Sequence, residues 1–162
     1  MTGQLRTARL DLEPLRMDHA AEAAQVFDDA RLHVFTGGEP ATEDQLRERY
    51  ARQVGGLSPD GRQRWFNWML RRRDTGELIG TVQATVTETA ADLAWVVAVP
   101  HQGRGYATEA AHAVRDVLRD DGVSLFTAHI HPDHRASAGV ARALGMAPTG
   151  TVVAGEIRWA GG

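Results

Sequence analysis

The sequence predicts a single α+β domain built on a mixed, largely antiparallel sheet with about four flanking helices. Three observations predict this class. The 162 residues suit one compact domain. Strand-like and helix-like patterns follow one another without a repeat or a linker. In the middle of the chain, three strand patterns are joined by short polar turns typical of hairpins. We therefore predict that residues 1–162 form one domain.

The first half of the chain predicts a strand and two helices. Residues 8–15 alternate around three leucines and predict the strand. Residues 18–27 have a helix-forming composition, with alanines spaced for one face. Thr42 and Gln45 predict a capping box that opens a second helix, which runs to about residue 54, because each side chain can satisfy a backbone N–H group of the other residue. A surface loop is expected over residues 55–61, which are rich in glycine.

The second half predicts a three-stranded meander followed by alternating helices and strands. The meander strands are expected over residues 65–72, 78–87 and about 92–97. Alanines and valines between residues 107 and 118 recur at helical spacing, and residues 124–130 read as a strand. A shorter helix over residues 136–144 is expected to end at Gly145, and one or two strands follow within residues 146–159.

Composition excludes several classes of function. The chain has no cysteine, which excludes disulfides, thiolate metal sites and a cysteine-bound covalent intermediate. The net charge of −3 gives no basic footprint for nucleic acid. No apolar run has the length of a membrane span or the place of a secretory signal. We therefore expect a cytoplasmic protein with no nucleic-acid or membrane partner, either a monomer or a homodimer.

The segment between the strand ending at Val97 and the following helix is the most informative. Gly103 and Gly105 flank Arg104, and an amphipathic helix begins immediately afterwards. The first N–H groups of a helix have no internal partner, and glycine allows a ligand to approach the backbone closely. Such a loop can cradle a pyrophosphate, although a glycine-rich turn without a ligand has the same pattern. A dinucleotide fold fits less well, because Thr108 replaces the third glycine and no parallel βαβ unit precedes the loop.

The run Gln102-Gly-Arg-Gly-Tyr-Ala107 resembles the Q/R-x-x-G-x-G/A signature of the GNAT acetyltransferases, and it lies between the expected strand and helix. The runs Ala91-Asp-Leu-Ala-Trp-Val-Val97 and Ala8-Arg-Leu-Asp-Leu-Glu-Pro-Leu15, together with the order of elements, resemble the branch that acetylates ribosomal-protein N-termini (RimJ/RimL type). This resemblance extends over nearly the whole chain. It implies acetyl-CoA as cosubstrate and a V-shaped cleft between the strand ending at Val97 and the strand over residues 124–130.

By the same resemblance, backbone groups around Val97 would hold the pantetheine arm and the thioester carbonyl. The residues expected to bind acetyl-CoA are Val97, Gln102, Gly103, Arg104, Gly105, Tyr106, Ala107 and Thr108. The absence of cysteine favours direct attack by an amine within a ternary complex.

A second segment, His131-Pro-Asp-His134-Arg-Ala-Ser137, resembles the N-x-x-S segment of the family, with His134 in the place of the asparagine. Ser137 is expected at or near the helix N-cap, a role that would itself explain a serine there. Alternatively, its hydroxyl could protonate the departing thiolate. Many relatives use a tyrosine for this step, but no tyrosine follows Tyr106, which leaves Ser137 or His134 as the candidate acid.

The pattern His129-x-His131-x-Asp133-His134 also matches a zinc motif of metallo-β-lactamase-type hydrolases. No histidine follows His134, however, whereas that fold takes later ligands from downstream histidines. We therefore expect no metal.

An amine must lose its proton before it attacks a thioester, so a positioned base is useful. Asp92, which aligns with an acidic residue common in this branch, is the first candidate, and Glu88 in the preceding turn is the other. Asp92 could equally be a solvated residue at a strand start. The Val97 N–H is expected to stabilise the oxyanion.

Alternation places Trp65 and Asn67 on one face of a strand and Phe66 and Trp68 on the other. One set is expected in the core, although both could be plain core packing. We assign Trp65, Asn67 and Phe35 to the acceptor pocket of an N-acetyltransferase acting on a primary amine, either a protein N-terminus or a small molecule. A non-catalytic acyl-CoA-binding sensor with the same fold is the alternative.

Overall fold

The computed structural model describes residues 3–162; the first two residues of the predicted domain lie outside this range. These residues form one eight-stranded sheet in the order β1-β2-β3-β4-β5-β6-β8-β7. The elements, in chain order, are β1 (Leu5–Arg6), β2 (Leu10–Pro14), α1 (His19–Val26), α2 (Glu43–Gln53), β3 (Gln63–Arg72), β4 (Leu78–Thr87), β5 (Ala90–Val97), α3 (Tyr106–Asp120), β6 (Leu125–Ile130), α4 (Arg135–Ala143), β7 (Ala147–Val153) and β8 (Glu156–Gly161), with short 3₁₀ helices at Ala30–His33 and Val99–His101.

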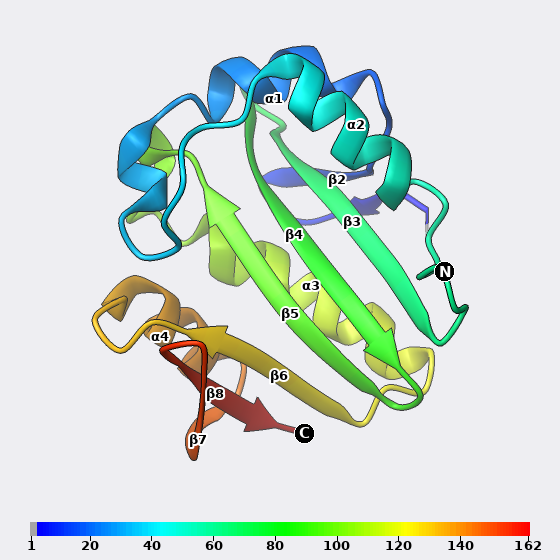
Figure 1. Cartoon of the computed structure of the whole chain (residues 1–162), viewed down its shortest axis with the longest axis vertical. Coiled ribbons are helices and arrows are strands. Elements are labelled where there is room, and N and C mark those ends of the chain that lie inside the picture. The colour runs from blue at the N-terminus through cyan, green and yellow to red at the C-terminus, as the bar shows by residue number, and fades with distance from the viewer. Residues whose placement is uncertain (1–2) are drawn as a thin grey trace.

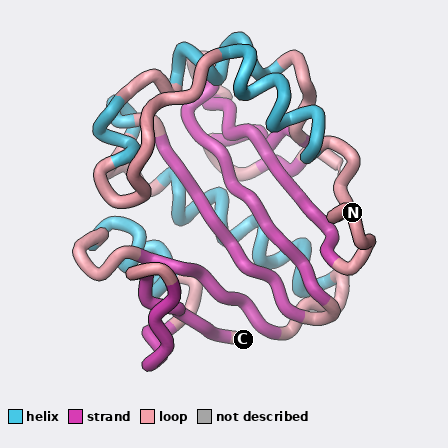
Figure 2. The backbone as a smooth tube through the Cα atoms, in the orientation of Figure 1, coloured by secondary structure: helices cyan, strands magenta, loops and turns pink. Residues whose placement is uncertain are grey.

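The sheet is mixed and largely antiparallel, as predicted. Every neighbouring pair is antiparallel except β5 and β6, which run parallel. That parallel ladder joins only residues 90–92 of β5 to residues 125–127 of β6. Beyond Asp92 and Thr127 the two strands diverge in a V, which Figure 1 shows as strands separating toward their arrowheads and Figure 2 as two separating tubes.

Helices cover both faces of the sheet, and each face has its own core. α3 crosses behind the strands in Figure 1, and with α4 it packs on buried side chains such as Phe66, Trp68 and Phe126. α1 and α2 pack on the opposite face over Met69 and Leu78. This division follows the alternation of β3, since Met69 points away from Trp68. No helix formed by residues 3–162 combines the length and the apolar character that crossing a membrane requires.

Most predicted elements are confirmed within two residues. The capping box of α2 is present: the Gln45 N–H donates to Thr42 Oγ1 at 3.2 Å, and the Thr42 N–H donates to Gln45 Oε1 at 2.9 Å. Gly145 follows α4 with φ +84°, as a C-terminal cap requires. The two-residue strand β1 was not expected, because two residues are too few to show alternation.

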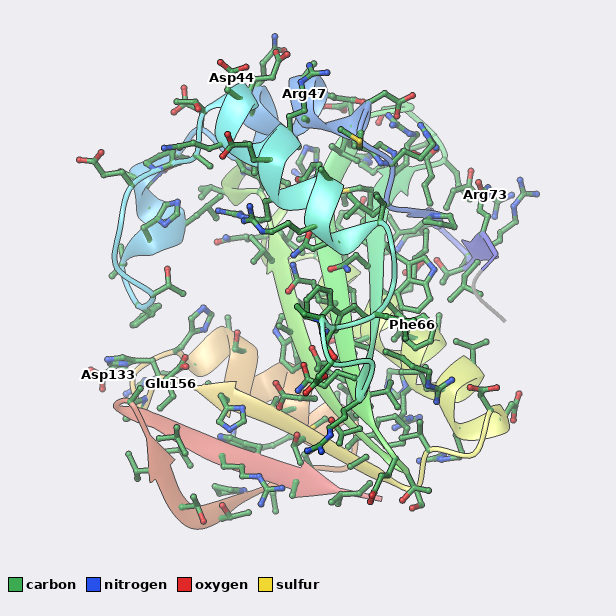
Figure 3. All side chains as sticks on the ribbon, turned by 45° about the vertical axis from the view of Figure 1, so that its right-hand side comes forward. Asp44, Arg47, Phe66, Arg73, Asp133 and Glu156 are labelled. Carbon is green, nitrogen blue, oxygen red and sulfur yellow. The ribbon has the colours of Figure 1, made fainter. Side chains whose placement is uncertain are left out.

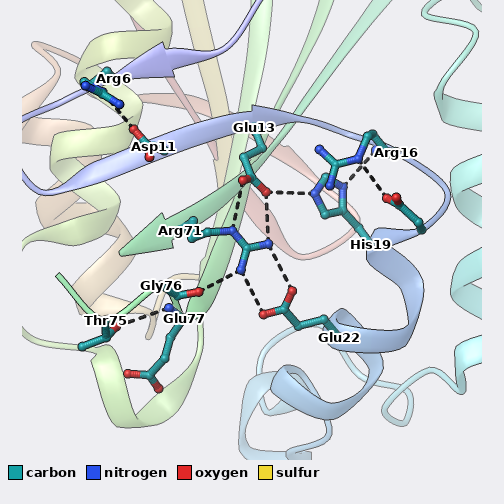
Figure 4. A network of polar contacts seen from close by, with 11 residues as sticks. Arg6, Asp11, Glu13, Arg16, His19, Glu22, Arg71, Thr75, Gly76 and Glu77 are labelled. Carbon is teal, nitrogen blue, oxygen red and sulfur yellow. Dashed lines mark hydrogen bonds and ion pairs between the residues drawn. The ribbon is translucent and has the colours of Figure 1, made fainter. Parts of the chain in front are cut away.

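A polar network ties β2, β3 and α1 together at the edge of the sheet (Figure 4). Arg71 on β3 makes two contacts with the carboxylate of Glu13 and two with that of Glu22, all of 3.0–3.1 Å. His19 Nε2 lies 3.1 Å from Glu13 Oε1. Burial raises the pKa of Glu13, but hydrogen bonds from Arg71 and His19 outweigh it and leave this pKa below its ordinary value. The hydrogen bond from Arg71 likewise lowers the pKa of Glu22.

Arg71→Ala is expected to lower the free energy of unfolding by about 2 kcal/mol, because it leaves two carboxylates without their shared cation. Because both pKa values are lowered in the folded protein, this stabilisation is fully present at pH values above the ordinary glutamate pKa. It is lost as the pH falls through the folded-state pKa values. Urea unfolding at pH 7 and pH 3 should therefore show a difference from wild type that narrows at the lower pH.

The exposed i,i+4 pair of Arg47 with Glu43 offers a matched control, and Figure 3 shows Arg47 on the outer face of α2. Arg47→Ala should cost no more than about 0.5 kcal/mol. Equal losses in the two variants would contradict a structural role for the Arg71 network.

Candidate active site

The end of β5 presents backbone groups to the opening between β5 and β6. The Ala98 N–H donates to the Ile79 carbonyl at 2.8 Å, on the β4 side. Backbone groups of successive residues in an antiparallel strand point to alternate sides, so the Val97 N–H points toward β6. The Val97 carbonyl accepts from Gln102 Nε2 at 2.9 Å. Val97 thus has an N–H directed into the opening, as the predicted oxyanion donor requires, while Gln102 occupies its carbonyl.

The glycine loop presents free amides beside this opening. Gly103 and Gly105 have φ values of +75° and +83°, in the left-handed region that favours glycine. The N–H groups of residues 101 and 102 donate to the carbonyls of Ala98 and Val99. The helical hydrogen bonding of α3 begins with the Glu109 N–H and the Gly105 carbonyl, at 3.0 Å. The N–H groups of residues 103–108 therefore have no helical acceptor, which is the arrangement that the predicted anion cradle requires.

Arg9 flanks the cradle from the other end of the chain. Its guanidinium lies 4.2 Å from the centroid of the Tyr106 ring and pairs with Glu109 at 2.7 Å. Burial raises the pKa of Glu109, but hydrogen bonds from Thr7 and Arg9 lower it overall, so this carboxylate is compensated in the first turn of α3. Tyr106 is buried, so its backbone N–H rather than its side chain is available to the predicted cradle.

Ser137 lies near the start of α4, as expected, but it is not the N-cap, which corrects its expected capping role. The cap is His134, whose Nδ1 accepts from the Ser137 N–H at 3.0 Å. Asparagine in the family pattern offers a similar side-chain acceptor, so the histidine retains a capping function. Ser137 instead occupies the third position of the helix, where its hydroxyl is not used as a cap.

The hydroxyl of Ser137 lies among groups that direct its proton outward. Trp95 Nε1 donates to Ser137 Oγ at 3.2 Å, and His134 Nε2 lies 3.5 Å from the same oxygen. Because His134 Nδ1 is an acceptor, the neutral ring carries its proton on Nε2. Burial lowers the pKa of His134 and favours this neutral form. With both lone pairs of Oγ approached by donors, the Ser137 O–H is free to donate elsewhere.

Asp92 lies at the last pair of the β5–β6 ladder, where the strands begin to diverge. Its Oδ1 accepts from Thr127 Oγ1 at 2.7 Å and lies 3.0 Å from His129 Nδ1. Asp92 is therefore held by two side chains of β6 rather than simply solvated at a strand start. Glu88, the other carboxylate considered, lies in the β4–β5 turn with φ +55°, before β5 begins.

The structure assigns Trp65 and Asn67 to an open hollow and Phe66 and Trp68 to the core. The hollow has a volume of about 300 Å³ and lies between α2 and the sheet. The residues lining it are Arg49, Arg52, Gln53, Trp65, Asn67, Gln83, Ala84 and Thr85. In the sheet register Trp65 pairs with Thr85, and Thr85 with Asp92, so the row of side chains under the hollow leads to Asp92.

Phe35 does not line this hollow. Its ring lies 5.0 Å from that of His131 and 4.5 Å from that of His134, measured between centroids. Phe35 therefore belongs to the segment over the start of α4, near Ser137, and lies apart from Trp65 and Asn67. Sequence alone cannot separate these residues, because the loop after α1 can reach either side of the diverging strands.

A larger hollow of about 490 Å³ lies beside the first half of β3, between Pro14 and the loop after α2. It shares Gln53, Trp65 and Asn67 with the first hollow but contains no residue of the glycine loop. Its larger volume therefore does not identify this hollow as the active site.

The histidine pattern that resembles a zinc motif does not converge. His129 Nδ1 faces Asp92, His131 Nδ1 accepts from the Asp133 N–H, and His134 Nδ1 accepts from the Ser137 N–H. Figure 3 shows Asp133 at the outer tip of the loop after β6. Within residues 3–162, no group of three or more potential ligands is placed to hold a metal ion.

Sequence reasoning missed several residues that the structure places at the site. His129 was considered only as part of the zinc pattern, although its spacing from Thr127 puts both on the face of Asp92 once β6 pairs with β5. Arg49 and Arg52 could have been recognised as one face of α2 by their i,i+3 spacing. For Arg9 and Trp95, no local pattern indicates their partners.

Comparison with known proteins agrees with this geometry. The sequence model of the acetyltransferase (GNAT) domain matches residues 9–147. Among curated proteins, no sequence matches the chain significantly. An acetyltransferase from Agrobacterium tumefaciens is 25% identical, with a TM-score of 0.77 over 98% of this chain and 94% of that one. A GNAT-family acetyltransferase from Bacillus anthracis is 18% identical, with a TM-score of 0.79 over 97% and 96%.

RimJ of Mycobacterium smegmatis, solved in complex with a CoA disulfide, is 20% identical, with a TM-score of 0.79 over 98% of this chain and 85% of that one. The chain thus shares its fold with solved acetyltransferases. Since the family match spans most of the sequence and includes the glycine loop, the chain belongs to the GNAT acetyltransferase family.

Proposed function

We propose that the protein is an acetyl-CoA-dependent N-acetyltransferase that acts on a primary amine, either a protein N-terminus or a small molecule. The observation that carries this proposal is the set of free amides at residues 103–108 beside the unpaired edge of β5. The amides suit a diphosphate, and the edge suits an extended chain with amide groups. RimJ of Mycobacterium smegmatis, whose fold this chain shares, was solved with a CoA disulfide.

The proposed reaction is direct transfer. The amine attacks the thioester carbonyl and forms the C–N bond, while the Val97 N–H stabilises the oxyanion. Collapse of the tetrahedral intermediate breaks the C–S bond, and the Ser137 hydroxyl donates its proton to the departing thiolate. His134 supports this step by contact with Ser137 rather than by donating directly, since its protonated Nε2 lies against Ser137 Oγ. Asp92 provides the carboxylate on the acceptor side.

The charge of the hollow indicates which amine acceptors the protein would prefer. Arg49 and Arg52 line it, and neither forms an ion pair within residues 3–162. Asp92 lies at the far end of the row through Trp65 and Thr85. An amine that reaches Asp92 while an anionic group lies near the two arginines would satisfy both charges. We therefore expect acceptors with an acidic group near the amine, such as peptides with an acidic second residue, to be preferred.

A panel of amines tests the proposal, with CoA release measured and corrected for acetyl-CoA hydrolysis. Matched peptides that differ only in glutamate or lysine at the second residue should differ in kcat/KM by about tenfold, and this ratio should fall with added salt. Turnover with any amine supports the enzyme. Thermal stabilisation by acetyl-CoA without turnover on a broad panel would support the non-catalytic sensor instead.

A further inference from the structure

The side chain of His129 forms, with Asp92 and Thr127, a polar cluster at the point where β5 and β6 separate. His129 Nδ1 lies 3.0 Å from Asp92 Oδ1, and Thr127 Oγ1 donates to the same oxygen at 2.7 Å. Thr127 is buried, whereas about a third of the His129 side chain is exposed. The cluster therefore has a fixed inner end and an accessible imidazole edge.

The carboxylate of Asp92 favours one tautomer of this imidazole. Its charged oxygen, which can only accept, lies 3.0 Å from Nδ1, and the attraction between them favours a proton on that nitrogen. The neutral ring then has its proton on Nδ1 and an unprotonated Nε2, which has no hydrogen-bond partner among residues 3–162. An imidazole held in this way by a carboxylate is the arrangement in which histidine accepts a proton at Nε2.

The position of His129 suits contact with the acceptor. It is the first residue of β6 beyond the last ladder pair on the Asp92 face, since Thr127 pairs with Asp92 and side chains alternate. The same face carries Thr85 and Trp65, which line the hollow under α2. His129 therefore lies on β6 at the start of the opening between the strands, on the same sheet face as the residues of β3 and β4 that line the hollow.

We infer that His129 is the general base of the acetyl transfer, with Asp92 as its positioning residue. This inference rests on the proposed function. His129 Nε2 takes one proton from the attacking nitrogen as the C–N bond forms, and the Ser137 hydroxyl gives one proton to the thiolate released when the C–S bond breaks. Proton exchange with solvent then returns His129 to its neutral form and Ser137 to its hydroxyl, so the reaction is balanced. A histidine suits this task because its imidazole can take up a proton at Nε2 while a carboxylate lies against Nδ1.

The charged groups that face the cluster come from three neighbouring elements. His131 follows on the same face of β6, and Arg158 of β8 is the cross-strand partner of His129. Arg49 and Arg52 of α2 line the hollow beyond Thr85. A control variant on the same strand is therefore needed to separate the effect of these groups on the pH profile from that of His129.

The test compares pH profiles of kcat/KM for wild type, His129→Gln and His131→Gln, using the best acceptor of the amine panel. His129→Gln should lower kcat/KM by about 100-fold at pH 7 and leave the acetyl-CoA Kd unchanged. In the pH profile of this variant, the acidic limb should be replaced by a steady rise of kcat/KM with pH, because solvent then removes the proton from the attacking amine. His131→Gln should retain the wild-type profile. Added imidazole should restore activity to His129→Gly, which a purely structural contact with Asp92 would not explain.

A His129→Gln profile parallel to that of wild type, with no imidazole rescue of His129→Gly, overturns the assignment of His129 and leaves the proposed function intact. Wild-type protein that binds acetyl-CoA but acetylates no amine overturns both. Circular dichroism and thermal melts of each variant ensure that a loss of rate is not a loss of fold.

Discussion

Gly105→Glu is expected to raise the Kd for acetyl-CoA by at least about 100-fold, an effect of roughly 3 kcal/mol. The new side chain would project from the loop that presents free amides, and its carboxylate would repel the phosphates that those amides attract. A Cβ at this position lies 3.5 Å from a terminal nitrogen of Arg9, so glutamate would also compete for that guanidinium. Calorimetric titration with acetyl-CoA and with CoA measures the change.

Gly122→Glu serves as the matched control for this substitution. Gly122 follows the other end of α3, has φ +100° and has no atom within 4 Å of an added Cβ. Gly122→Glu therefore introduces the same charge change as Gly105→Glu and a similar backbone strain of about 1–2 kcal/mol, but at a position far from the cradle. Acetyl-CoA should bind this variant as it binds wild type. Equal weakening in both variants would show that backbone strain, and not the cradle, causes the loss.

Ser137→Ala is expected to lower kcat by at least about 100-fold while the acetyl-CoA Kd stays unchanged. The reason is that the hydroxyl, approached by Trp95 Nε1 and His134 Nε2, is the donor proposed for the departing thiolate. The stability of α4 should change little, because the cap is the side chain of His134. Single-turnover rates and thermal melts, measured together, separate the two roles.

Ser137→Thr retains a hydroxyl at the same place and should recover much of the lost rate. A wild-type kcat in Ser137→Ala would remove Ser137 from the mechanism. A variant that loses both rate and several degrees of melting temperature would instead indicate that the serine supports the helix.

The parts of the fold that depend on local pattern could be predicted from the sequence. The capping box of Thr42 and Gln45 and the stop at Gly145 are local, and both are confirmed. The glycine loop is also local, because its geometry follows from two left-handed residues at the start of a helix. The assignment of Ser137 as a possible cap was wrong for a local reason, since serine is a far commoner cap than histidine.

The remaining parts of the site depend on register, which a single sequence does not reveal. Asp92 and His129 are 37 positions apart and meet because three ladder pairs align β5 with β6. A shift of one residue would turn His129 to the opposite face. Alternation likewise separates Trp65 from Phe66, but which of them faces the core is determined by the helices on each side.

The short ladder between β5 and β6 leaves a strand edge inside the sheet instead of at its rim. Exposed strand edges pair readily with other extended chains and are a common cause of aggregation. Here the edge of β5 faces the diverging β6, so a second folded domain cannot approach it broadside. A narrow, extended molecule with amides at strand spacing can still enter. Peptidomimetics of that shape should therefore compete for this edge, which makes it a target for inhibitors unrelated to nucleotides.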